Sequence, residues 1–475
     1  MEQGHDQEPT GVAAVPTPID VAREDYWLPF AVPHGLMPDR QFDGRPAMVQ
    51  VHRVRPVYAA GQRPKVRQAV VLIHGRTVTG PVVFDLRARD QNNVLLSVQE
   101  ALARAGIDTF APSLLGYGGS TRFDEGLNDP GNASRRAYPD LPDSPCQFPE
   151  GCDRNNPLLT INPLNQQQQL LPAGTSPAGK PLFFRRAHSS NFHFARTDVW
   201  VRDIDQVIDD AIERARPTDR KVALVGYSAG GQHVGRTLYA NNNNQQLLQA
   251  NDGLEAGLHI RANVIEKVSR VVFVNSLFGG LTEELDPLGL PTFPLTLEDR
   301  AASDALWTRP ATSTAVCNGR ILLSTQQKVW DQNMENDTMG RAWGPTPWLG
   351  SGTSTDGLNR APTFSGYGWN ADVAGQLSTP TLVMQGLEDG ILPTPPGPAT
   401  GPAIFNSLKV AENKVLVKVA CASHALPWEG CDGVGCKPPH ATLKEALIEW
   451  IRKGKFNNHA NGSFTVNEKG QVTSP

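Results

Sequence analysis

The sequence predicts an α/β fold in which a mostly parallel central sheet is covered by helices on both faces. Short apolar and β-branched runs recur along the chain, and segments with helical spacing separate them. Both patterns together are typical of βαβ units, because parallel strands need long crossover connections. A hairpin over residues 47–58 is expected to start the fold. The expected strands that follow are 69–74, 107–111, 222–225, 270–275, 381–384 and 415–420. The expected helices are 93–105, 198–216, 232–240 and 443–451.

The first half of the sheet begins at Ala-Val-Val-Leu-Ile-His, residues 69–74, an apolar run that predicts a strand buried on both faces. Residues 93–105 then carry apolar side chains at helical spacing and end at Gly106, a residue that commonly terminates helices. The strand 107–111 follows. Residues 198–216 have an apolar stripe of helical period and predict an amphipathic helix.

The second half repeats this alternation. The four apolar residues 222–225 and the run Arg-Val-Val-Phe-Val-Asn at 270–275 predict two further buried strands. The same pattern returns at 381–384 and 415–420. The helical segment 443–451 closes the fold.

Length and composition set the class of protein. The chain has 475 residues, of which 39% are hydrophobic and 19% charged, as in soluble globular proteins with a sizeable core. One elaborated domain or two fit this length. The net charge of −4 gives no reason to expect nucleic acid as a partner. No apolar run approaches the ~20 residues of a membrane-spanning helix, and the polar segment 1–17 lacks the apolar core of a signal peptide.

Two long interruptions divide the expected sheet. Residues 121–195 are rich in Pro, Gly, Asn and Gln and predict an irregular surface loop, whereas residues 276–379 contain five of the nine tryptophans and predict a cap or lid. The expected organisation is a lead-in at 1–44, a core at 45–275 and 380–455 that carries the loop 121–195, a cap at 276–379 and a tail at 456–475.

The most informative motif is Gly226-Tyr-Ser-Ala-Gly230, which lies directly between the strand 222–225 and the following helix. A turn this tight forces a strained backbone on Ser228, and it requires glycine where any Cβ meets the neighbouring strand or helix. The turn exposes the Ser228 hydroxyl at a helix N-terminus, where the helix dipole favours developing negative charge. Ser228 is therefore the expected nucleophile. A glycine-rich turn with a capping serine is the alternative.

A serine nucleophile needs a base and a group that orients the base. Catalytic groups collect at the carboxyl ends of the strands in such sheets. Asp389 follows the strand 381–384, and His424 follows the strand 415–420. The expected triad is Ser228, Asp389 and His424. Glu388 is the alternative acid and His440 the alternative base.

These motifs resemble those of the α/β-hydrolase superfamily, over most of residues 45–455 except the two insertions. The matching segments are His74-Gly75 after a strand, Gly116-Tyr-Gly-Gly-Ser120, the elbow Gly226–Gly230, Gly386 to Pro393 around Asp389, and Ser423-His424. The chain departs from the family in its long loop after Ser120 and its large segment before Asp389. The resemblance implies an α/β-hydrolase fold with a large cap insertion, in a serine esterase or lipase-like enzyme.

Roles for further residues follow from this assignment. The backbone N–H groups of Arg76 and Ala229 are the expected oxyanion hole, and His74 is expected to hold that turn rather than act as base. The candidate residues of the substrate pocket are Tyr227, Trp307, Trp330, Trp343, Trp348 and Trp369. An alternative for each tryptophan is a place in the core of the cap.

The chain has six cysteines, and four of them form two close pairs in the sequence, Cys146 with Cys152 and Cys431 with Cys436. Each pair lies in a Pro- and Gly-rich segment that a local disulfide would brace. Cys317 and Cys421 can pair only if the cap folds over the base. Disulfides favour a secreted or periplasmic protein, and six free thiols in a cytoplasmic enzyme are the alternative. Neither spacing is that of a zinc site.

The expected function is hydrolysis of an ester or lactone of a mainly apolar small molecule through an acyl-enzyme. The same triad serves an amidase, a peptidase or an acyltransferase, and a non-catalytic binding protein on this fold is a further alternative. The sequence has no cofactor motif and predicts neither a cofactor nor a metal.

Overall fold

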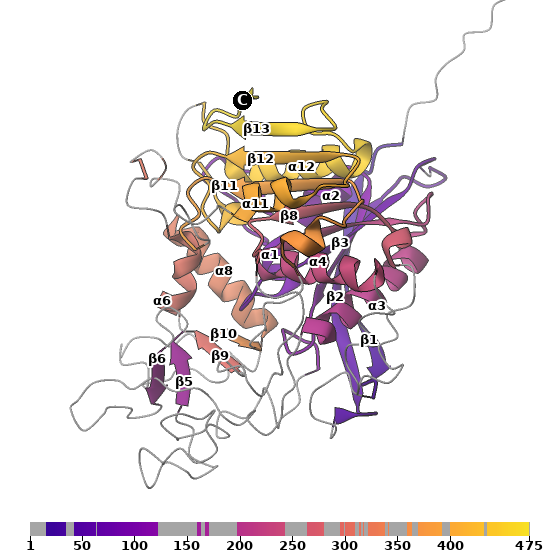
Figure 1. Ribbon diagram of the computed structural model, residues 1–475, viewed down its shortest axis with the longest axis vertical. Helices are drawn as coiled ribbons and strands as arrows, with labels where there is room; N and C mark the ends of the chain where they lie inside the picture. Colours follow the sequence, from indigo (N-terminus) through magenta and orange to yellow (C-terminus); the bar gives the residue numbers. More distant parts are fainter. Residues whose placement is uncertain are drawn as a thin grey trace, which may run out of the picture.

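A single ten-stranded sheet forms the centre of the protein in the computed structural model (Figure 1). Its strand order is β1-β2-β4-β3-β7-β8-β11-β12-β13-β14. The structure describes residues 16–34, 42–62, 64–121, 159–162, 167–170, 197–242, 264–279, 295–298, 300–308, 313–314, 317, 322–337, 341, 359–362, 369–391, 400–431 and 435–474.

The sheet begins with an antiparallel hairpin, continues as parallel strands and ends on an antiparallel one. β1 (Asp20–Ala31) pairs with β2 (Pro46–Val57), which pairs with β4 (Ile107–Ser113). From β4 to β13 all neighbours are parallel. These strands are β3 (Gln68–Ile73), β7 (Val222–Tyr227), β8 (Val268–Val274), β11 (Thr381–Gly386), β12 (Lys414–Val419) and β13 (Gly462–Val466), and β14 (Val472–Thr473) closes the edge.

Helices cover both faces of the sheet because the side chains of each strand point alternately to opposite faces. Val71 and Ile73 of β3 join one apolar cluster, and Val70 and Leu72 join the other. The first cluster includes side chains of α3 (Thr197–Ala215), α4 (Ala229–Asn242), α10 (Ala371–Ala374) and α11 (Thr400–Ser407). The second includes side chains of α1 (Gly80–Phe84), α2 (Val98–Arg104), the 3-10 turn η9 (Leu426–Trp428) and α12 (Pro439–Lys453).

The predicted α/β fold is confirmed, and so is every predicted strand of the parallel sheet, with boundaries that differ by a few residues. Three strands of the central sheet lie outside the predicted core, among them the two-residue β14 in the expected tail. β1 falls in the expected lead-in 1–44, and β13 falls in the expected tail 456–475. β1 escapes detection because only Leu28 of its side chains is buried, so the strand has no regular apolar period. β13 is short and begins at a glycine.

Parts of the two insertions lie together beside the sheet, at the lower left of Figure 1, whereas Trp369 and α10 of the second belong to the first apolar cluster. β5 (Leu159–Asn162) and β6 (Gln167–Leu170) form a hairpin within the segment expected to be irregular. It neighbours β9 (Leu295–Glu298), which pairs with β10 (Asn359–Pro362). The segment 276–379 also supplies α6 (Arg300–Ser303), α8 (Leu323–Asn336) and the 3-10 turn η7 (Asp304–Trp307), and a further 3-10 turn, η5 (Val264–Lys267), precedes β8.

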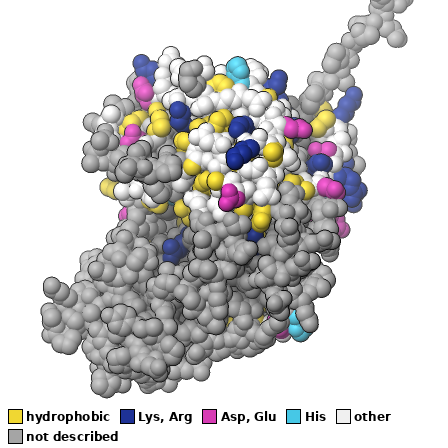
Figure 2. All heavy atoms as spheres, viewed as in Figure 1, with side chains coloured by type: hydrophobic (Ala, Val, Ile, Leu, Met, Phe, Trp, Pro, Cys, Tyr) yellow, Lys and Arg dark blue, Asp and Glu magenta, His cyan; other side chains and the backbone are white. Residues whose placement is uncertain are grey.

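On the face shown in Figure 2, basic and acidic side chains of the described residues lie interspersed among apolar ones. Among the described residues, none of the helices has both the length and the apolar character needed to cross a bilayer.

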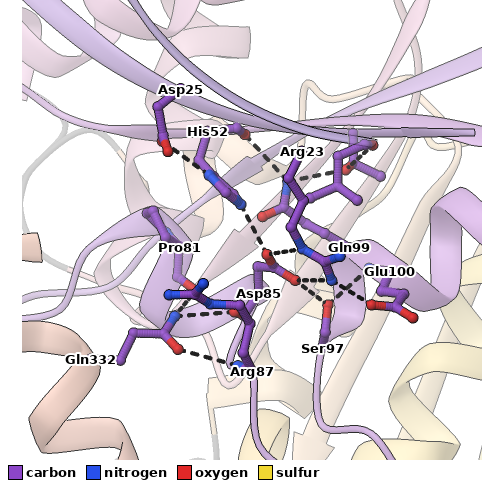
Figure 3. A network of polar contacts seen from close by, with 12 residues as sticks. Arg23, Asp25, His52, Pro81, Asp85, Arg87, Ser97, Gln99, Glu100 and Gln332 are labelled. Carbon is purple, nitrogen blue, oxygen red and sulfur yellow. Dashed lines mark hydrogen bonds and ion pairs between the residues drawn. The ribbon is translucent and has the colours of Figure 1, made fainter. Parts of the chain in front are cut away.

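Asp85 joins the N-terminal hairpin to α1 (Figure 3). Its buried carboxylate accepts hydrogen bonds from His52 Nε2 (2.9 Å) and Arg23 Nε (2.8 Å), and from the hydroxyl of Ser97. Asp25 contacts the other ring nitrogen of His52 at 3.0 Å. Burial lowers the pKa of His52, but the two carboxylates outweigh it and raise the pKa to about 9. The charged pair of His52 and Asp85 thus fixes Asp85, the C-cap residue of α1.

Replacing Phe464 of β13 by alanine tests whether the C-terminal segment belongs to the core. Phe464 is buried and packs against Phe456 with ring centroids 5.7 Å apart. Loss of a buried phenylalanine is expected to lower the free energy of unfolding by about 3–5 kcal/mol. Urea unfolding measures it, with exposed Thr473→Ala as the control. Equal stability of the two variants contradicts a structural role for β13.

The Asp85 network predicts a pH dependence of stability. Because the pKa of His52 in the folded protein is raised from 6.5 to about 9, its stabilising charge is fully present below pH 6.5 and is lost as the pH rises through 9. The free energy of unfolding of wild type should therefore fall over this interval more steeply than that of His52→Gln. His34→Gln, at an exposed histidine, is the control. Identical pH profiles for wild type and His52→Gln contradict the prediction.

Candidate active site

Ser228 occupies the turn between β7 and α4 in a left-handed conformation, with φ of 55°. This conformation is uncommon for any residue with a Cβ, and it persists only where the surroundings over-determine it. The N–H of Ser228 donates to Val274 O of β8 at 3.0 Å. Its carbonyl accepts the N–H groups of Gly231 and Leu277, each at 3.1 Å. The hydroxyl is therefore carried by a backbone that is bonded on both sides.

The glycines around Ser228 allow the close approach of three elements. A Cβ at Gly226 would lie 2.4 Å from Gly231 Cα, and one at Gly230 would lie 2.3 Å from Ile73 O. Both contacts are with backbone, which cannot move aside. As predicted from the sequence, the two glycines leave no room for a Cβ next to the neighbouring strand and helix.

The structure brings Ser228, His424 and Asp389 together from three strand ends. His424 Nε2 lies 2.8 Å from Ser228 Oγ, and His424 Nδ1 lies 2.8 Å from Asp389 Oδ2. Asp389 also accepts the N–H of Ile391 at Oδ1 (3.0 Å), which holds the carboxylate in place. All three residues are buried, with Ser228 the most exposed at 9%. The arrangement can move a proton from the hydroxyl to the imidazole.

The alternative acid and base lie elsewhere. The carboxylate in contact with His424 is that of Asp389, not that of Glu388. His440 is fully buried and contacts Asp90 Oδ2 through Nε2 at 3.0 Å. Burial, only partly offset by that hydrogen bond, lowers the pKa of His440. The pair is therefore a structural contact between α12 and the segment before α2.

Asn275, directly after β8, links the loops that carry Asp389 and His424. Its Nδ2 donates to the carbonyls of Ser423 (2.8 Å) and His424 (3.2 Å), and its Oδ1 accepts the N–H of Gly386 (2.8 Å). The hydroxyl of Tyr227 donates to the same His424 carbonyl at 2.8 Å. Sequence reasoning does not single out Asn275, although a polar residue that ends an otherwise apolar strand is a signal for it.

The loop before His424 has two further supports. Cys421, with φ of 54°, forms a disulfide with Cys317, so the segment 276–379 is tied to the loop that carries His424. Glu429, fully buried, accepts the N–H of Ser423 at 2.7 Å. Glu429 is a second residue that the sequence analysis does not identify.

The second cysteine pair predicted from the sequence also lies within the described chain. Cys431 and Cys436 are at disulfide distance. Cys146 and Cys152 lie outside the described residues.

The turn after β3 lies directly against Ser228. A Cβ at Gly75 would come within 2.9 Å of Ser228 Cβ. Leu114 N–H donates to His74 Nε2 (3.0 Å), so Nδ1 carries the proton and donates to Gly75 O (2.6 Å). Burial lowers the pKa of His74 to about 4, which keeps the ring neutral. His74 thus holds the turn, as predicted, and the half-buried Arg76 follows it.

The pocket candidates have different surroundings. Trp343 and Trp348 lie outside the described residues. Trp369 is fully buried and stacks on Phe273 at 4.7 Å, which places it in the core rather than in a pocket. Tyr227 likewise packs between the rings of His424 (5.3 Å) and Trp428 (6.0 Å), so it supports the histidine loop.

Trp307 and Trp330 are each 3% exposed. Trp307 packs beside Trp428, with ring centroids 6.0 Å apart, and its cluster includes Val329 of α8. Trp307 therefore packs in the interior where the segment 276–379 meets the helical layer, and Trp330 is buried on α8.

Comparison with known proteins assigns the family. A model of the alpha/beta hydrolase family matches residues 70–434. The chain belongs to the alpha/beta hydrolase family. No curated protein matches the sequence.

Solved structures of other alpha/beta hydrolases resemble this chain at low identity. A serine hydrolase from Cycloclasticus zankles is 12% identical with a TM-score of 0.42, covering 92% of this chain and 100% of that one. A bromoperoxidase from Bacillus anthracis is 14% identical with a TM-score of 0.41, covering 86% and 97%. The thioesterase domain of the curacin biosynthetic pathway is 13% identical with a TM-score of 0.39, covering 91% and 100%. None of these similarities bears on the substrate.

The contacts of Asn275 predict that Asn275→Ala slows the reaction of Ser228 with a fluorophosphonate by about 10–100-fold, because small displacements of reacting groups are costly. Tyr227→Phe is the matched control. It removes a donor from the same His424 carbonyl but leaves the other contacts of Asn275 in place, so its effect should be smaller. The labelling rate of each folded variant checks this. A wild-type rate for Asn275→Ala contradicts the prediction.

Proposed function

We propose that the protein is a serine hydrolase that cleaves a carboxylic ester or lactone of a mainly apolar small molecule through an acyl-enzyme. One observation carries the proposal: a continuous chain of hydrogen bonds from Ser228 Oγ through both ring nitrogens of His424 to Asp389, each 2.8 Å long. A hydroxyl is a weak nucleophile, and this chain supplies the base and the group that orients it.

In the first half of the reaction, Ser228 Oγ attacks the substrate carbonyl carbon while His424 Nε2 takes the hydroxyl proton. Asp389 keeps the Nδ1 proton of His424 in place and stabilises the imidazolium. When the tetrahedral intermediate collapses, the bond to the leaving oxygen breaks and His424 gives its proton to that oxygen. A water molecule, deprotonated by His424, then attacks the acyl carbon; the bond from that carbon to Ser228 Oγ breaks, His424 returns the proton to Oγ, and the acid is released.

The negative charge on the carbonyl oxygen requires donors beside Ser228. Ala229 is the first residue of α4, and the first N–H groups of a helix have no partner within it. Arg76 follows Gly75, which lies against Ser228. We assign the N–H groups of Ala229 and Arg76 to the oxyanion hole, where each such donor is worth about 3 kcal/mol of the barrier.

An apolar substrate is favoured by the surroundings of the acid loop. Leu387 and Ile391, on either side of Asp389, are 45% and 42% exposed. The N–H of Gly390 donates to Thr308 O in the segment 276–379 at 3.1 Å, so this loop and the proposed cap are adjacent. The bonded cysteine pairs favour a secreted or periplasmic location.

Removal of the triad residues tests the proposal. Ser228→Ala, His424→Ala and Asp389→Asn should each lower kcat for p-nitrophenyl esters by about 10⁴–10⁶-fold, and the losses should not add in the triple variant because the residues act as a unit. Ser423→Ala, next to the base, tests whether a nearby change of similar size is tolerated.

The choice of substrate separates this function from related ones. A panel of p-nitrophenyl esters and p-nitroanilides should show cleavage of the esters and little of the anilides. Faster cleavage of anilides overturns the ester assignment, and ester cleavage that survives Ser228→Ala overturns the nucleophile.

A further inference from the structure

Thr77 is held in a strained conformation one residue after Arg76. Its φ is 64°, and its side chain is 4% exposed. A positive φ is a genuine outlier for a β-branched residue, and it persists only where surrounding contacts enforce it. The Thr77 hydroxyl donates to Arg76 O at 2.7 Å. The turn that follows β3 is therefore under strain at the residue beside the proposed oxyanion donor.

A side chain from the segment 276–379 holds this strained residue. Asn333 of α8 donates through Nδ2 to Thr77 O at 3.0 Å and to Asn359 Oδ1 at 2.6 Å. Both asparagines are buried, with exposed fractions of 3% for Asn333 and 1% for Asn359. Both hydrogens of the Asn333 amide are thus used, one on the turn and one on β10.

The adjacent residue of α8 fixes the helix to α1, as Figure 3 shows. Gln332 Nε2 donates to the carbonyls of Pro81 and Asp85, each at 3.0 Å, and its Oε1 accepts Arg87 N–H at 3.1 Å. These are backbone groups at the two ends of α1 and just after it. The Asp85 side chain is itself bound by His52 and Arg23, so the backbone that α8 contacts is held in place.

We propose that Asn333 is a positioning residue for the oxyanion hole, which rests on the function proposed above. His74 holds the Gly75 carbonyl, which shares a peptide plane with the Arg76 N–H. Asn333 holds the carbonyl of Thr77, the residue that directly follows Arg76. The orientation of the Arg76 N–H is thereby fixed from both directions. The insertion contributes to the chemical step through this contact, in addition to any contact with substrate.

Asn333→Ala should lower kcat for a p-nitrophenyl ester by about 10–100-fold while KM changes little, because the turn loses its alignment and the binding surface does not. Asn333→Asp, which keeps the size of the side chain but not its N–H donors, should behave in the same way. Asn336→Ala is the matched control, since Asn336 lies on the same helix and, within the described part of the chain, its amide donates only to Gln332 O of that helix. It should retain the wild-type kcat.

Thr77→Gly separates positioning from general packing. Glycine adopts a positive φ without a Cβ penalty, so the turn no longer needs Asn333 to enforce it. The fold-loss in kcat caused by Asn333→Ala should therefore be smaller in the Thr77→Gly background than in wild type. Thermal unfolding of each variant verifies that the folded protein is assayed.

Three results overturn the inference while leaving the proposed function intact, provided that Ser228→Ala abolishes activity. They are a wild-type kcat for both Asn333 variants, an equal loss for Asn336→Ala, and a loss from Asn333→Ala that is undiminished in the Thr77→Gly background. Ester hydrolysis that survives Ser228→Ala overturns the proposed function, and this inference with it.

Discussion

The close approach of backbone around Ser228 is the constraint on which the site depends. Gly230 packs against Ile73 O, and Gly75 packs against the Ser228 side chain itself. With no room for a Cβ at these positions, β3, β7 and the start of α4 come into direct contact. Ser228 is thereby fixed at φ of 55° beside the turn that carries Arg76. A looser turn would bury the hydroxyl against the sheet or remove it from the helix N-terminus.

Asp389 and His424 reach Ser228 through a different kind of support. Their loops have little regular structure and are joined by buried side chains that satisfy backbone groups. Asn275 bonds three of these groups, and Glu429 bonds a fourth. Buried polar groups are costly when unpaired, so each such side chain also specifies one arrangement of the loops. The disulfide from Cys421 to Cys317 extends this support into the segment 276–379.

The sequence alone predicts the parallel sheet and the order of nucleophile, acid and base, because both depend on local patterns. Buried strands read as apolar runs, and glycines mark the turn at Ser228. β1 is not predictable in this way, since eleven of its twelve side chains are not buried and its place is set by pairing with β2. Asn275 and Asn333 contact residues more than a hundred positions away, so a local pattern can mark such a residue, as the end of an apolar strand marks Asn275, but cannot identify its partners.

The tryptophans of the insertion illustrate the same limit. Their density predicts an aromatic pocket, but Trp369 packs in the core on Phe273. Composition indicates that a segment buries aromatic rings, but it does not identify the residues or ligand on which those rings pack. Only the fold decides whether a ring meets a ligand or another side chain.

The central claim is that Ser228 forms a covalent bond to the substrate carbonyl carbon. Its most direct test is peptide mapping by mass spectrometry after brief exposure of the native protein to a fluorophosphonate. We expect one adduct per chain, on the peptide that contains Ser228, and no adduct after prior unfolding. An adduct on another residue, or none on native protein that still hydrolyses esters, would show that Ser228 is not the nucleophile.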